Sequence, residues 1–133
     1  MVDRPAVVDA SAIAAILFNE PTASRVESVL RGKPLVAPSL LAYEVANVAV
    51  RKIQLYPEQA EGLRKSAGLL DRLEIDYVQV PAQSLVDSAA ATGLTSYDTA
   101  YLFLSRELEL PLLTLDSELR AAARRQGIET LDH

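Results

Sequence analysis

Short apolar runs alternate with longer amphipathic segments along nearly the whole chain of 133 residues. The runs have the length and residue types of buried strands, and they occupy residues 5–9, 34–37, 75–80, 111–115 and 128–131. The segments between them show helical spacing, at residues 11–20, 22–32, 40–53, 58–73, 82–93, 96–108 and 116–127. Strands separated by helices need crossover connections, which make the strands parallel and cover both faces of the sheet. We therefore predict an α/β fold with three layers, α/β/α, and a central parallel sheet.

Capping and turn residues mark several helix boundaries. Thr22 and Ser39 are expected to cap the helices after them, because short hydroxyl side chains satisfy free N–H groups at helix starts. Gly32 and Gly127 are expected just past helix ends, where glycine tolerates the left-handed conformation. The helix at 40–53 carries apolar residues at most positions, so we expect it to be buried on most sides.

The composition fits one domain spanning residues 1–133. Half of the residues are hydrophobic, which is enough for a substantial core, and neither a linker nor an internal repeat is visible. The apolar stretches are interrupted before they reach bilayer-spanning length, and the N-terminus lacks the basic start and apolar core of a signal peptide. We expect a soluble cytoplasmic protein that does not enter a membrane.

The residue types that are missing restrict the chemistry. Cysteine is absent, which excludes disulfides, thiolate nucleophiles and zinc sites built on sulfur. The only histidine is the last residue, His133, so serine–histidine triads and two-histidine metal motifs are excluded unless the terminus supplies the group. Carboxylates, hydroxyls and amides remain, and these are the ligands of hard cations such as Mg²⁺ and Mn²⁺.

Two acids come directly after predicted strands. Asp9 ends the run at 5–9 and Asp116 comes after the run at 111–115. In parallel α/β sheets the binding crevice lies outside the carboxyl ends of the strands, so both acids point to one edge. On the helix at 40–53, Glu44 and Asn47 lie one turn apart among apolar neighbours, and Asp98 lies in the first turn of the helix at 96–108. These four acids are the candidate site residues.

Each acid also has a simpler structural interpretation. Asp9 and Asp116 could each cap the next helix, and Asp98 lies three residues after Thr95 in a pattern close to a capping box. Glu44 is expected beyond the first turn, where it would cap nothing, so its alternatives are an exposed polar stripe or a satisfied buried pair.

Other polar residues are weaker candidates. Ser11 has no nearby histidine or lysine to activate it, so we expect its hydroxyl to orient Asp9 or a metal-bound water. Tyr97 and Tyr101 are expected to pack with their hydroxyls at the edge, rather than to stack on a base. The net charge of −5 argues against a simple nucleic-acid binder, although cations bound at an acidic site would remove its repulsion of phosphate. The basic pairs, among them Arg64 with Lys65, are expected on solvated helix faces.

Two related α/β classes are excluded by the residues next to the acids. A response-regulator receiver needs a lysine after a late strand, whereas Ser117, Glu118 and Leu119 come after Asp116. A haloacid-dehalogenase phosphatase needs a second acid two residues after the first, where this chain has Ser11. The glycines are scattered, so no phosphate-binding glycine loop is present either.

Taken in order, the motifs VVDASAI, PSLLAYEVANV and TSYDTAYLFLSRELELPLLTLDSEL resemble a PIN domain, and the chain has the length of the VapC-like toxins. The likeness covers nearly the whole chain. It implies that the family's acids correspond to Asp9, Glu44, Asp98 and Asp116, with supporting residues at Ser11, Asn47 and Thr114.

This resemblance implies a ribonuclease dependent on Mg²⁺ or Mn²⁺ that hydrolyses RNA phosphodiester bonds with a metal-activated water at a site of four carboxylates. It also implies a cognate antitoxin protein and a homodimer as partners. Two alternatives from the residues remain open: a non-catalytic α/β module that binds protein or RNA, and a Mg²⁺-dependent phosphohydrolase with another substrate.

Overall fold

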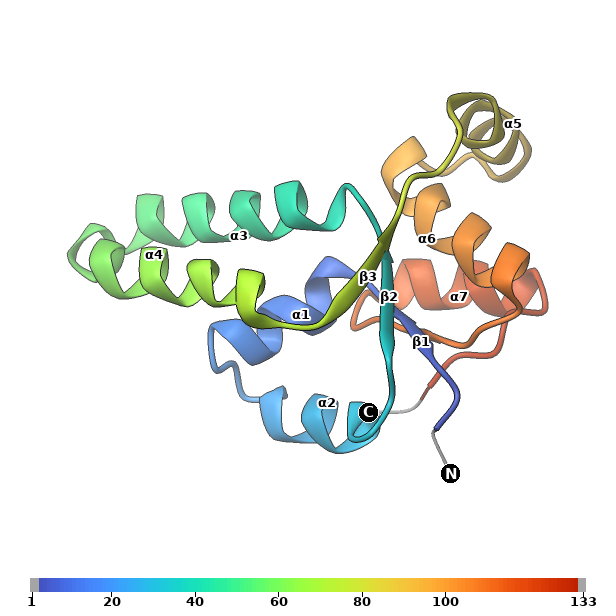
Figure 1. Cartoon of the computed structure of the whole chain (residues 1–133). Helices are drawn as coiled ribbons and strands as arrows, with labels where there is room; N and C mark the ends of the chain where they lie inside the picture. The colour runs from blue at the N-terminus through green and yellow to red at the C-terminus, as the bar shows by residue number, and fades with distance from the viewer. Residues whose placement is uncertain (1–2, 132–133) are drawn as a thin grey trace.

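The computed structural model describes residues 3–131, so His133 lies outside the described residues. Its strands are β1 (Ala6–Val8), β2 (Leu35–Pro38), β3 (Ile75–Val78) and β4 (Leu112–Leu113). The α-helices are α1 (Ala10–Leu17), α2 (Ala23–Leu30), α3 (Leu41–Leu55), α4 (Ala60–Gly68), α5 (Ala82–Thr92), α6 (Ser96–Leu108) and α7 (Ser117–Arg125). Two short 3-10 helices, η1 (Pro57–Gln59) and η2 (Leu69–Arg72), flank α4 (Figure 1).

The strands form one parallel sheet in the order β3-β2-β1-β4. This arrangement confirms the predicted α/β fold with a central parallel sheet. The predicted fifth strand at 128–131 is wrong, because only an isolated bridge joins Thr130 to Leu112. Because β4 has only two residues, residues 128–131 have few backbone groups of β4 to pair with.

The hydrophobic core lies around β1. All three residues of β1 are fully buried, as expected for a strand with neighbours on both sides and helices on its faces. Leu112 and Leu113 continue the core into β4, and Tyr101 and Ile13 are among its largest fully buried side chains. The core therefore fixes the end of β1, directly before Asp9.

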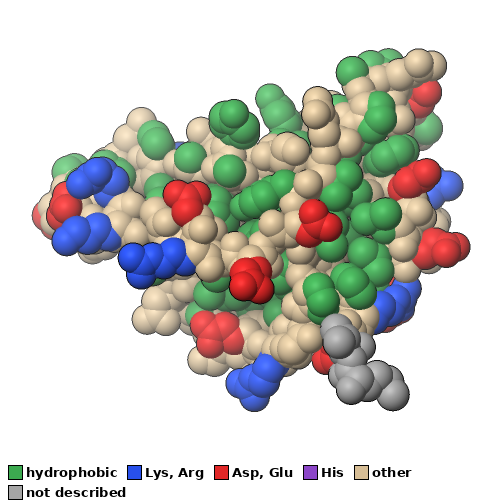
Figure 2. All heavy atoms as spheres, viewed as in Figure 1, with side chains coloured by type: hydrophobic (Ala, Val, Ile, Leu, Met, Phe, Trp, Pro, Cys, Tyr) green, Lys and Arg blue, Asp and Glu red, His purple; other side chains and the backbone are tan. Residues whose placement is uncertain are grey.

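Helices α3 and α4 run side by side and project from the sheet on the left of Figure 1. This geometry corrects the expectation for α3, of which only Leu41, Val45 and Ala49 are buried. Tyr43 is 76% exposed and Val50 is 50% exposed, because α3 has neighbours on one side and solvent on the other. Figure 2 shows Lys and Arg side chains, with some Asp and Glu, on the left over this projection, and apolar side chains over the centre of the same face.

Two of the predicted caps are also wrong. Thr22 stands at the start of α2 without a capping hydrogen bond from its side chain. The N-cap residue of α3 is Leu40, so Ser39 lies one residue too early to cap the helix. The Ser39 N–H donates to the Val78 carbonyl, which continues the pairing of β2 with β3. The two glycine terminators are confirmed: Gly32 and Gly127 lie just beyond α2 and α7 with positive φ angles of 78° and 75°.

Within residues 3–131, none of the helices has both the length and the apolar character that crossing a membrane requires.

Candidate active site

The four predicted acids line one cavity of about 260 Å³ at the carboxyl ends of β1 and β4. Asp9 and Asp116 lie just after these strands, whereas Glu44 and Asp98 come from the first turns of α3 and α6. The complete lining is Asp9, Ala10, Ser11, Glu44, Asn47, Val48, Arg51, Asp98, Tyr101 and Asp116. Acids from four separate elements thus face the same space.

Asp9 is the most buried of the four, with 5% of its surface exposed. Its Oδ1 accepts hydrogen bonds from the Ser11 hydroxyl at 2.7 Å and the Ala12 N–H at 3.1 Å, and its Oδ2 accepts one from the Thr114 hydroxyl. Burial raises the pKa of Asp9, the negative charge of Asp116 adds to the rise, and the hydrogen bonds oppose it. Asp9 also caps α1, so capping and cavity lining are compatible at this residue.

The pairing of β1 with β4 brings the supporting hydroxyls to Asp9. Val8 lies opposite Leu113, which places Thr114 beside Asp9 although the two are far apart in the chain. Ser11 accepts a hydrogen bond from the Leu115 N–H at 2.8 Å while its own hydroxyl points to Asp9. The structure therefore agrees with the expectation that Ser11 orients Asp9.

Glu44 is held by Tyr101, whose hydroxyl donates a hydrogen bond of 2.5 Å to Glu44 Oε1. Burial raises the pKa of Glu44, the charges of Asp9 and Asp98 add to this, and the hydrogen bond from Tyr101 opposes it. Because α3 begins at Leu41, Glu44 lies in its first turn, which corrects the expected position.

Tyr101 is a site residue that the sequence did not reveal. It is 1% exposed, and burial together with Glu44 raises its pKa well above the usual value, so the phenol remains a proton donor. The sequence feature that indicates this role is the position of Tyr101 one helical turn after Asp98, which puts both side chains on the same face of α6. Its packing was predicted, but a contact with a residue 57 positions away was not.

Asp98 and Asp116 make different hydrogen bonds at the starts of α6 and α7. The Thr95 hydroxyl accepts a hydrogen bond from the Asp98 N–H at 3.2 Å, which is half of a capping box. Among residues 3–131 no donor to the Asp98 carboxylate is found, and burial, together with the charges of Asp116 and Glu118, raises its pKa. Asp116 Oδ1 accepts from the N–H groups of Glu118 at 2.9 Å and Leu119 at 3.2 Å, so Asp116 does cap α7 while lining the cavity.

The donor types suit a hard divalent cation, because carboxylate, hydroxyl and amide oxygens converge on one cavity. Residues 3–131 contain no group of three or more His, Cys, Asp or Glu side chains already spaced for a metal ion. Oxygens of Asp9 and Glu44 are engaged by hydroxyl donors instead. Metal binding would therefore draw the carboxylates closer together than they are in this arrangement.

A larger hollow, of about 590 Å³, lies between α5 and α6. Its lining includes the acids Asp87 and Glu107 with Arg106, and the remaining side chains are neutral. Size alone does not identify a site, whereas several acids from different elements that face one cavity and have raised pKa values mark a candidate. The smaller cavity with the four acids is therefore the candidate active site.

Comparison with known proteins gives consistent results. The family model described as the PIN domain matches residues 6–125. Ribonuclease VapC3 from Pyrobaculum aerophilum is 35% identical over 124 residues, which cover 85% of this chain and 90% of that protein. The crystal structure of PAE2754, also from Pyrobaculum aerophilum, superposes with a TM-score of 0.73 at 23% identity, covering 90% of this chain and 85% of that one, and so shows the same fold.

Burial of the carboxylates, together with their mutual repulsion, predicts that the ionised cavity destabilises the metal-free fold. The pKa values of Asp9, Glu44 and Asp98 are raised on folding. The protonated carboxyl groups therefore stabilise the fold fully below the ordinary carboxyl pKa range, near pH 4. This stabilisation is lost as the pH rises through the raised pKa values of the folded state. We expect the free energy of unfolding of metal-free protein to fall over that interval. Asp98→Asn should be as stable as the wild type or more stable, by up to about 1 kcal/mol because water screens part of the repulsion.

Urea unfolding at several pH values measures both effects. The matched control is Asp87→Asn, which changes an exposed aspartate on α5 outside the cavity and should leave the pH dependence unchanged. Added Mg²⁺ should raise the melting temperature of the wild type and raise that of Asp98→Asn much less. Equal Mg²⁺ shifts in the two proteins would contradict a metal role for Asp98.

The hydrogen bond between Tyr101 and Glu44 gives a second prediction. Tyr101→Phe removes the donor, so we expect the free energy of unfolding to fall by about 1–2 kcal/mol and Mn²⁺ binding to weaken about 10-fold, because groups that orient metal ligands have effects of this size. Tyr97→Phe is the control, since Tyr97 lies on the same helix but is 61% exposed. Urea unfolding and calorimetric Mn²⁺ titration report the two quantities; unchanged Mn²⁺ affinity in Tyr101→Phe would show that the hydroxyl serves packing alone.

Proposed function

The chain belongs to the PIN-domain family, and on that premise we propose that it is a divalent-metal-dependent endoribonuclease and the toxin of a toxin–antitoxin pair. The observation that carries the proposal is the convergence of Asp9, Glu44, Asp98 and Asp116 on one cavity. The related protein named Ribonuclease VapC3 supports RNA as the substrate class.

In this proposal Asp9 and Asp98 would hold the metal ion directly, and Glu44 and Asp116 would complete the site, either directly or through water. Mg²⁺ or Mn²⁺ would supply positive charge to the scissile phosphate as negative charge develops on it. It would also offset the burial, and with it the mutual repulsion, that raise the carboxylate pKa values.

Side-chain hydroxyl groups orient two of the carboxylates. Ser11 and Thr114 fix the orientation of Asp9, and Tyr101 fixes that of Glu44. Glu44 or Asp116 would accept the proton of the attacking water, whose oxygen forms the new bond to phosphorus as the bond from phosphorus to the 3′ oxygen breaks. The leaving 3′ oxygen takes up a proton from solvent. The products are a 5′-phosphate and a 3′-hydroxyl, as the family resemblance implies.

We expect cleavage of single-stranded RNA with Mg²⁺ or Mn²⁺ and none in excess EDTA. Asp9→Asn should lower kcat by at least about 100-fold, because it removes the central carboxylate of the site, whereas Asp87→Asn should cleave as the wild type does. Gel analysis of an end-labelled RNA, with DNA and mononucleotides in parallel, distinguishes a ribonuclease from a broader phosphohydrolase. Full activity in EDTA would refute the metal-dependent mechanism, and no cleavage under any condition would favour a binding module.

The proposed partners are suggested by the surface of α3 and by the family. Tyr43 and Val50 lie two turns apart on one exposed face of this helix, and burying such apolar side chains favours association. We propose that this face packs against the same face of a second copy, in a two-fold symmetric homodimer. A cognate antitoxin protein is the proposed second partner.

Light scattering at micromolar concentration tests the homodimer, for which we expect twice the mass of the chain. Replacing Tyr43 and Val50 together by Asp should give a monomer, because charges would be buried in the contact. Leu55→Asp is the control, since Leu55 is 72% exposed at the end of α3 on another face. A monomeric wild type would count against the dimer.

A further inference from the structure

Arg51 stands out in the lining of the carboxylate cavity, because among residues 3–131 it is the only lysine or arginine there. It lies on α3 two turns after Glu44 and one turn after Asn47, so all three side chains share one face of the helix. The other charged groups of the lining are the four acids. Arg51 therefore stands at the rim of an otherwise acidic cavity.

Two other cations, one on α3 and one on α7, already have partners. Lys52 forms an ion pair of 3.2 Å with Glu20 and lies over the Phe18 ring, 5.6 Å from its centre. Arg120, on α7, donates a hydrogen bond of 2.8 Å to the Thr114 carbonyl. For Arg51, the part of the chain between residues 3 and 131 supplies neither an ion pair nor a hydrogen bond from its side chain, and the residue is exposed.

The cavity acids do not use Arg51 as a counter-ion. Among residues 3–131, no ion pair joins Arg51 to Asp9, Glu44, Asp98 or Asp116. The guanidinium is therefore not held against any of these carboxylates. Arg51 thus lines the cavity without neutralising it, and its five N–H donors remain available to a ligand.

We propose that Arg51 binds a phosphate of the RNA next to the one that is cleaved, and so positions the strand over the carboxylates. This inference rests on the proposed ribonuclease function. A protein with a net charge of −5 repels a polyanion, so a cation at the rim is needed to hold the phosphate that the metal site does not cover. Arginine suits this role because its planar fork can donate two hydrogen bonds to one phosphate.

Arg51→Gln tests the proposal in the full-length protein. We expect KM for single-stranded RNA to rise about 10-fold while kcat changes less than about threefold, because the contact holds substrate before and during the reaction. The slope of log binding constant against log salt should become shallower by about 0.7, the amount expected for one phosphate contact on a single strand. Mn²⁺ affinity should not change.

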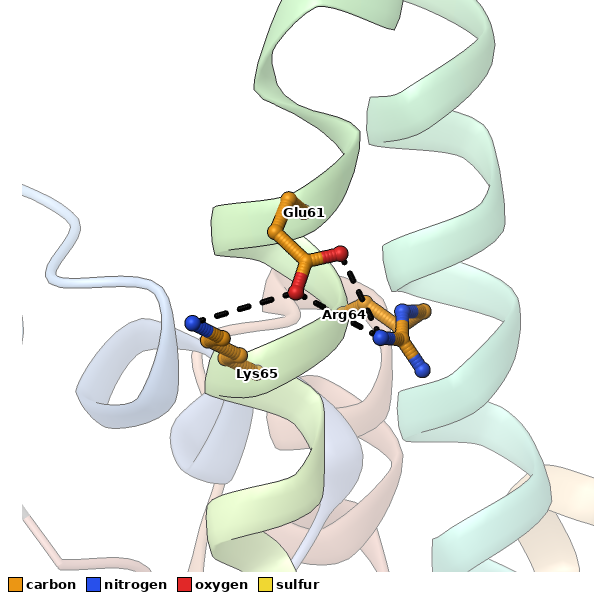
Figure 3. A network of polar contacts seen from close by, with 3 residues as sticks. All are labelled: Glu61, Arg64 and Lys65. Atoms are coloured by element: carbon orange, nitrogen blue, oxygen red, sulfur yellow. Dashed lines mark hydrogen bonds and ion pairs between the residues drawn. The ribbon is translucent and has the colours of Figure 1, made fainter.

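Two further variants serve as controls. Arg51→Lys keeps the charge but loses the fork, so the wild-type salt slope should persist with a smaller rise in KM. Arg64→Gln removes a comparable exposed arginine from α4, where Glu61 pairs with Arg64 at 3.3 Å and with Lys65 at 3.8 Å (Figure 3). Arg64 and Lys65 thus lie on an exposed helix face, as predicted for that basic pair, and Arg64→Gln should leave KM unchanged.

Other results would overturn the proposal. An unchanged KM and salt slope in Arg51→Gln would show that Arg51 does not touch RNA. A loss of kcat with unchanged KM, or weaker Mn²⁺ binding, would place Arg51 at the metal site instead. If the wild type cleaves no RNA with Mg²⁺ or Mn²⁺, the proposed function fails, and the salt slope of RNA binding still decides whether Arg51 contacts phosphate.

Discussion

The buried carboxylate of Asp9 is the group on which the arrangement of the site depends. Removing an ionised carboxyl from water is costly unless donors satisfy it. Here the donors come from α1 and from the segment after β4, so the Thr114 hydroxyl and the Ser11 hydroxyl join two strand ends through one side chain. The parallel pairing of β1 with β4 is what makes this contact possible. Sheet topology and site geometry are therefore fixed together.

The same cavity also opposes the stability of the fold. Each upward pKa shift of Asp9, Glu44 and Asp98 means that the ionised carboxylate is less favourable in the folded chain than in the unfolded one. The surrounding core is well placed to offset this cost, because β1 and most of α1 are buried. Natural proteins commonly sacrifice stability where charged groups must meet for function.

Much of this organisation could be predicted from the sequence. Alternating strand and helix patterns predict the parallel sheet, and the acids at the ends of the predicted strands 5–9 and 111–115 predict the edge where the cavity forms. The capping interpretation and the site interpretation do not exclude each other, because Asp9 and Asp116 cap α1 and α7 and also line the cavity. A carboxylate has two oxygens with several lone pairs, so one N–H contact does not exhaust it.

The features that could not be predicted depend on tertiary neighbours. Tyr101 reaches Glu44 across 57 positions of the chain, and no local pattern encodes that contact. The exposure of α3 depends on how far it projects beyond the sheet, which hydrophobic periodicity does not specify. Ser39 was expected to cap α3, but the parallel partner β3 takes its N–H into the sheet. In each case long-range packing decided what the local sequence left open.

Helix α3 contributes to the core, to the cavity and to the exposed surface, each through a different face. One face packs into the core through Val45 and Ala49, a second presents Glu44 and Arg51 to the cavity, and a third exposes Tyr43. Successive residues on a helix are about 100° apart, so the exposed apolar face directly adjoins the cavity face. Any protein that covers the apolar face therefore lies against the rim where RNA would enter. In the proposed function, association and substrate access would therefore be linked by the geometry of a single helix.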